Sequence, residues 1–171
     1  NTAVGYNSLG AANTGAGSTA VGKDALAANT SGQNTAVGRD ALTANTTGTE
    51  NVAMGVNTLD ANTTGDYNIA IGSSALGANT TADNNTAVGA NAMVVNTTGT
   101  RNVAVGTYAL DANTTANDNT AVGYNTATAI TTGASNTAVG ATALAALTTG
   151  GNNTAIGYYA LAAATDSASN T

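Results

Sequence analysis

The chain has 171 residues, carries a net charge of −6, and contains no His, Cys, Phe, Trp or Pro. Without His and Cys, nucleophilic dyads and triads lose their usual members, so the composition predicts neither an enzyme nor a cofactor site. Three basic residues are too few for a nucleic-acid surface, and no apolar run reaches the ~20 residues of a membrane span. The Gly-Gly-x-Gly-x-Asp pattern of calcium-binding β-rolls does not recur, so no metal site is expected.

One short motif recurs along the whole chain. Each copy is a tetrad that ends in Gly, and the copies are spaced by 17 residues eight times and by 16 once. The closing glycines are Gly5, Gly22, Gly38, Gly55, Gly72, Gly89, Gly106, Gly123, Gly140 and Gly157. Ten copies at one period predict a single repeat array over 1–171, not several domains.

Each repeat begins with a predicted short strand. In residues 51–55, Asn-Val-Ala-Met-Gly, the apolar residues three and one before the Gly share one face, because side chains alternate along a strand. The Ala between them lies on the other face. The Gly that ends the strand predicts a bend.

The segment after the Gly carries Leu four positions on in eight repeats and Ala six positions on in nine. Its alternation favours a second short strand or extended coil. A single helical turn is the competing interpretation, although five residues are too few for a stable isolated helix. The first two positions after the Gly vary most and are expected to face outward; they include Tyr6, Lys23, Asp24, Arg39, Asp40, Tyr108, Tyr124, Tyr158 and Tyr159.

A repeat of this size cannot bury its own apolar face, so neighbouring repeats must stack as a parallel sheet. The predicted fold is an all-β roll or solenoid of ten coils, about 48 Å long at ~4.8 Å per coil. An Asn stands four residues before the Gly in nine repeats. Stacking would align these amides as a ladder, a stabilising device in stacked β structure.

The residue two before the Gly is Ala in all ten repeats. A position that accepts only Ala suggests close approach of another backbone, so this column is the candidate oligomer or stacking contact. Its members are Ala3, Ala20, Ala36, Ala53, Ala70, Ala87, Ala104, Ala121, Ala138 and Ala155. Together with a thin core, it predicts a homo-oligomer, most simply a trimer, or a filament. The absence of capping repeats predicts a window of a longer fibre.

A second Asn column matches the acceptor pattern for N-glycosylation, Asn-x-Ser/Thr. The candidate glycosylation sites are Asn29, Asn45, Asn62, Asn79, Asn96 and Asn113, with Asn84 and Asn152 outside the column. The alternative is a duplicated turn consensus, because Asn suits turns. The Thr pairs in these turns raise ice binding as a further possibility, but the Thr column of the strand is interrupted by Val52, Ile69 and Val103.

The columns Asn-(Thr/Val/Ile)-Ala-(Val/Ile)-Gly, as in residues 68–72 and 102–106, resemble the head repeats of YadA-type trimeric autotransporter adhesins, and similar repeats occur in phage tail fibres. The resemblance covers all ten repeats, although the period of 17 is longer than is usual in adhesin heads. It implies a left-handed parallel β-roll, three chains around one axis, display outside the cell, and binding to matrix, cells or other surfaces.

The function expected from these patterns is a structural or adhesive extracellular fibre segment, located at a cell surface or on a virion. Its expected partners are copies of itself, host or surface ligands, and covalent glycans. The alternative is a surface-recognition module that binds a repetitive ligand, ice or a glycan, through its Thr and Asn columns.

Overall fold

The computed structural model describes residues 1–11 and 15–170 and contains, within these ranges, only β-strands and turns. The strands are β1 (Thr2–Val4), β2 (Thr19–Val21), β3 (Thr35–Val37), β4 (Val52–Met54), β5 (Ile69–Ile71), β6 (Thr86–Val88), β7 (Val103–Val105), β8 (Thr120–Val122), β9 (Thr137–Val139) and β10 (Thr154–Ile156). We call each strand, with the residues up to the next strand, a coil. The described residues include no helix that could cross a membrane.

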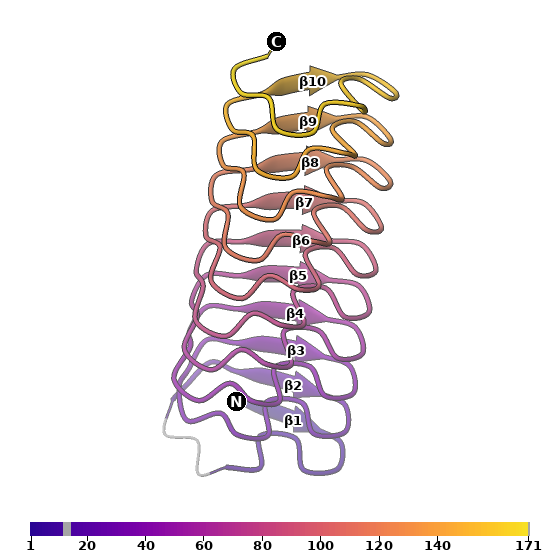
Figure 1. The fold of residues 1–171 in the computed structure, drawn as a ribbon. Coiled ribbons are helices and arrows are strands. Elements are labelled where there is room, and N and C mark those ends of the chain that lie inside the picture. The colour runs from indigo at the N-terminus through magenta and orange to yellow at the C-terminus, as the bar shows by residue number, and fades with distance from the viewer. Residues whose placement is uncertain (12–14, 171) are drawn as a thin grey trace.

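The ten strands form one parallel sheet in chain order, β1 to β10, along one side of a rod (Figure 1). Pairing is in register, so that each Ala pairs with the Ala of the next coil; Ala53, for example, pairs with both Ala36 and Ala70. The predicted all-β solenoid is therefore confirmed, with ten parallel strands in about nine turns.

The core is thin and consists mainly of two columns of buried side chains, one of Ala and one of Leu. The Ala of each strand points inward and, in β2 to β10, is at most 2% exposed. It packs with a column of Leu that includes Leu42, Leu59 and Leu76, each fully buried. Burying these small side chains stabilises the fold only through their repetition, because each contributes little apolar area.

The segment after each strand is neither a second strand nor a helical turn, so the strand prediction made for it was wrong. The second and fourth residues after the Gly, such as Asn57 and Leu59, have φ of 54° and 50°, in the left-handed region. Two left-handed residues separated by one ordinary residue bend the chain repeatedly, which aims Leu59 inward while Asn57 stays near the surface.

The Gly that ends each strand is fixed by the stacking of coils. Gly55 has a φ of 141°, and a Cβ on it would lie 2.7 Å from the carbonyl oxygen of Gly72 in the next coil. Only Gly adopts this backbone conformation readily, and only Gly leaves room for the neighbouring carbonyl.

Coil 8 departs from the interior Leu and Asn columns at two positions. Ala127 replaces the core Leu, and Ile130 replaces the Asn found three residues later in coils 2 to 7. Both side chains are buried. Coil 9 also replaces this Asn, with the buried Leu147, and keeps its core Leu144, so the two replacements do not depend on each other.

Candidate functional site

Two ladders of Asn side chains run through the interior of the rod. In the first, which precedes the strands, Asn51 donates from its backbone N–H and from Nδ2 to Oδ1 of Asn34, at 3.0 and 3.3 Å. Its Nδ2 also donates to the carbonyl oxygen of Gly65, at 2.7 Å. The same backbone contact recurs from Asn68 to Asn170. The predicted amide ladder is confirmed.

The second ladder is the column with the glycosylation pattern. Asn45 Nδ2 donates to Oδ1 of Asn29 at 2.7 Å and to the carbonyl oxygen of Gly48 at 2.9 Å. Both amide hydrogens of Asn45 are therefore used. The column is fully buried: Asn29, Asn45, Asn62, Asn79, Asn96 and Asn113.

This burial changes the expectation for N-linked sugar. A glycan on any of these six side chains would have to leave the interior, which would break the hydrogen bonds that hold adjacent coils together. The folded coil has no room for it. The sequons at Asn84 and Asn152 lie outside the ladder, and both Asn residues are exposed.

The second ladder ends inside the protein. Asn113 is followed one coil later by Ile130, which has no amide to donate. Oδ1 of Asn113 is consequently buried without a hydrogen-bond partner. A buried acceptor without a donor costs about 1–3 kcal/mol. We find no polar group that compensates for it among the described residues.

The invariant Ala column makes stacking contacts within one chain. Its side chains from Ala20 to Ala155 are buried in the chain's own core, against the same column in adjacent coils; Ala3 in the first strand is exposed. The side chain at this position must be small because the interior of the rod is narrow. A contact between chains would have to use the outward columns, because buried side chains cannot reach a second chain.

The outer face of the sheet carries no charged residue. It is formed by the first and third residues of each strand, which are Thr, Val, Ile or Met. Met54, Ile69, Ile71 and Val105 are between 36% and 42% exposed. Thr is the first residue of seven of the ten strands, β1, β2, β3, β6, β8, β9 and β10, so this face alternates between apolar and hydroxyl side chains.

The Thr pairs form two unlike columns in the turns. The first Thr of each pair donates its hydroxyl to the same position one coil on, as in Thr46 Oγ1 to the Thr63 carbonyl oxygen at 3.0 Å. The second Thr is exposed, as at Thr47 and Thr64. The turns therefore present a single outward row of Thr hydroxyls beside a row that ties the coils together.

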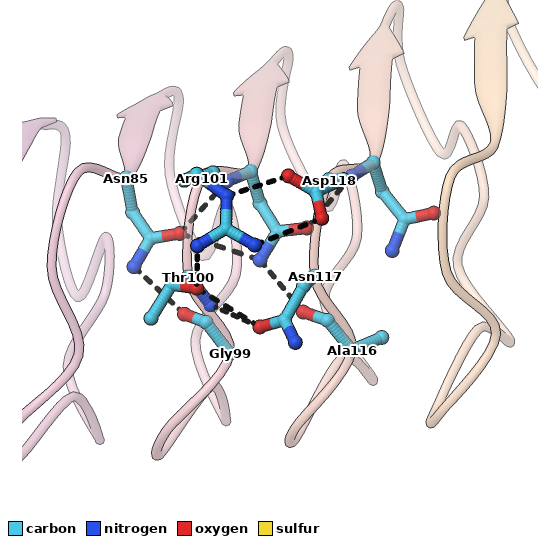
Figure 2. A network of polar contacts seen from close by, with 9 residues as sticks. Asn85, Gly99, Thr100, Arg101, Ala116, Asn117 and Asp118 are labelled. Carbon is cyan, nitrogen blue, oxygen red and sulfur yellow. Dashed lines mark hydrogen bonds and ion pairs between the residues drawn. The ribbon is translucent and has the colours of Figure 1, made fainter.

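A polar corner precedes the strands on the other edge of the sheet. Figure 2 shows Arg101 against Asp118 in the next coil, with Nε and Nη2 at 2.7 and 3.0 Å from the two carboxylate oxygens. Beneath the pair, Thr100 donates from its backbone and hydroxyl to Oδ1 of Asn117. The hydrogen bond from Arg101 lowers the pKa of Asp118. Because the pair is exposed, it adds little stability.

The corner after the strands carries the most varied side chains, and the prediction that these positions face outward is confirmed. Lys23 and Arg39 each pair with the Asp that follows. In coils 7, 8 and 10 the same two positions hold exposed tyrosines: Tyr108, Tyr124, Tyr158 and Tyr159.

No pocket and no cluster of three metal-ligating side chains is formed by the part of the chain that the structure describes. No protein-family model, curated protein or solved structure matches this chain. The interaction surfaces that remain are the outer sheet face, the Thr row and the two corners.

Proposed function

We propose that this chain is a structural or adhesive segment of an extracellular fibre, and that it performs no catalysis. The observation that carries the proposal is the stack of contacts along the rod. The paired strands, the first Asn ladder and a row of Thr hydroxyls join coil to coil, and the second Asn ladder adds to them in coils 2 to 7. Such a stack can be lengthened by repetition without changing its cross-section, which suits a spacer.

Adhesion is tested by the retention of coated beads. Beads that carry the chain are passed over surfaces coated with extracellular matrix, over cell layers and over immobilised polysaccharides. We expect retention on at least one surface, above that of beads coated with the heat-unfolded chain at equal density. Retention on none of them would contradict the adhesive part of the proposal.

Self-association belongs to the same proposal, as a homotrimer or filament displayed on a cell surface or virion. The outer sheet face supports it, because an exposed face of Val, Ile, Met and Thr can pack against a second copy. Ten strands at ~4.8 Å give this face a length of about 48 Å. Sedimentation at micromolar concentration should show a species of about three chains, and a folded monomer of 16.3 kDa would contradict the trimer.

The second candidate is a surface-recognition module for a repetitive ligand, ice or a glycan. The outward Thr row, which includes Thr47, Thr64 and Thr81, is the feature that favours it. The Asn columns are buried and cannot take part. Thermal hysteresis at micromolar protein would establish ice binding in place of the fibre function.

A further inference from the structure

The corner after the strands changes character along the rod. In coils 7, 8 and 10 it carries four tyrosines, which we call the tyrosine face: Tyr108, Tyr124, Tyr158 and Tyr159, exposed by 40%, 57%, 75% and 55%. The corner is the turn that follows the arrowhead of each strand (Figure 1). Four of the six tyrosines of the chain therefore lie at this corner in three of the last four coils.

The tyrosine face is held in register by the backbone. Thr142 N–H donates to the carbonyl oxygen of Tyr124 at 3.0 Å, and Tyr159 N–H donates to that of Ala141 at 3.1 Å. These bonds place Tyr124, Ala141 and Tyr158 in a row along the rod axis. The two tyrosines are two coils apart, about 9.6 Å, and the small Ala141 lies between them.

This part of the corner is uncharged. Coils 2 and 3 place Lys23, Asp24, Arg39 and Asp40 at the two positions after the Gly, whereas coils 4 to 10 place no charged residue there. The second position after the Gly holds the neutral polar residues Asn125 in coil 8 and Thr142 in coil 9. The chemistry offered is aromatic rings with neutral hydrogen-bonding groups.

The fold does not require tyrosine at this corner. The second position after the Gly is left-handed in every described coil, with φ of 59° at Tyr108 and 57° at Tyr159. Asn or Asp, which tolerate this conformation better, occupy it in six other coils. The ring of Tyr159 packs edge-to-face on Tyr158, with centroids 4.4 Å apart, and does not enter the core.

We infer that the tyrosine face binds a neutral, linear polysaccharide, with sugar rings against Tyr124 and Tyr158. An exposed ring offers a rigid apolar surface at small entropic cost and a hydroxyl at its edge, which matches the alternating C–H and O–H groups of a pyranose. A row of rings along the axis suits an extended polymer, and the lack of charge suits a neutral one. The inference rests on the proposed adhesive function and names the chemistry of its ligand.

The test is native gel electrophoresis in gels that contain hydroxyethylcellulose, galactomannan or dextran as neutral probes, with alginate as the anionic one. We expect at least one neutral probe to retard the chain, and alginate not to do so. The double variant Tyr124→Ala/Tyr158→Ala should bind the retarding probe at least about fivefold more weakly. The matched control, Tyr6→Ala/Tyr67→Ala, removes two exposed tyrosines outside the tyrosine face, one at this corner in distant coil 1 and one in the turn before β5, and should bind like the parent.

Retardation by none of the neutral probes, retardation by alginate alone, or equal loss in the two double variants would overturn the inference. Circular dichroism of both variants separates loss of binding from loss of fold. The bead experiment is read separately: retention on matrix or cells without polysaccharide binding would sink this inference and leave the proposed function standing.

Discussion

The side-chain amides of Asn residues join neighbouring coils in two separate ladders. Asn51 and Asn45 each accept from the next coil and donate to the previous one, so neither can be replaced without leaving a neighbour unpaired. Buried amides are stable only when their hydrogen bonds are made. Sequence alone predicted the first ladder, because its Asn precedes a strand. It did not predict burial of the second, because Asn-Thr-Thr-Gly has the composition of an exposed turn.

The position of an Asn within the second ladder should decide what its loss costs. Asn79→Leu removes the donor to Asn62 Oδ1 and leaves that buried acceptor without a partner. Asn113→Leu likewise leaves Asn96 Oδ1 without its donor, but it also removes Asn113 Oδ1, a buried acceptor that is already unpaired. We expect Asn79→Leu to be more destabilising by about 1–3 kcal/mol, in chemical denaturation. Equal losses would show that the ladder contributes little.

Two carboxyl groups at the fifth position after the Gly link stability to pH. Burial raises the pKa of Asp60 and of Asp111. A group with a raised pKa binds its proton more tightly when the chain is folded, so these two destabilise the fold at neutral pH and cease to do so as the pH falls through the raised pKa. Asp60→Asn/Asp111→Asn should therefore raise the thermal midpoint at pH 7, with a gain that shrinks in acid.

The control for this pH effect is Asp24→Asn/Asp118→Asn. Hydrogen bonds from Lys23 and Arg101 lower the pKa of these two carboxyls, so their stabilising contribution is present at neutral pH and is lost in acid. That variant should lower the midpoint slightly at pH 7. A rise in both double variants would indicate a general effect of net charge.

At the scale of the element, the strands could be predicted because β-branched residues alternate with Ala. The turn after each strand could not. Its left-handed positions hold Leu59 or Tyr108, residues that ordinarily avoid this conformation. Stacking of coils, not local preference, fixes that backbone. The same holds for the Ala column. The sequence showed that only a small side chain fits at this position, but not that the chain's own interior sets the limit.

A substitution of the Gly that ends a strand tests directly how closely the coils stack. Gly55→Ala puts a Cβ 2.7 Å from both the Gly72 carbonyl and Thr58 Oγ1, in a backbone conformation that only Gly adopts readily. The conformational cost alone is about 1–3 kcal/mol. We expect a lower denaturation midpoint for Gly55→Ala and almost no change for Ser73→Ala, an exposed position in the next coil. A midpoint equal to that of Ser73→Ala would contradict the close approach.

At the scale of the whole molecule, each strand contacts only the strands before and after it. Stability is then a sum of neighbour terms, and a weak coil divides the rod into two parts. The hydrogen bonds between coils run along the axis, so tension applied to the two ends of the chain loads them one coil at a time. This arrangement distinguishes the rod from a globular domain, whose contacts must break together.

Pulling the chain by its ends should therefore release it in steps. Freeing one coil of 17 residues adds roughly 50 Å of length, given ~3.4 Å per extended residue and the ~4.8 Å already spanned. We expect a series of such steps in single-molecule force measurements, beginning at the terminal coils of the parent. In Gly55→Ala the strained contact between coils 4 and 5 should lower the force of the steps that free those coils and leave the others unchanged. One all-or-none rupture in both proteins would mean that coils far apart on the rod are coupled, which neighbour contacts alone do not provide.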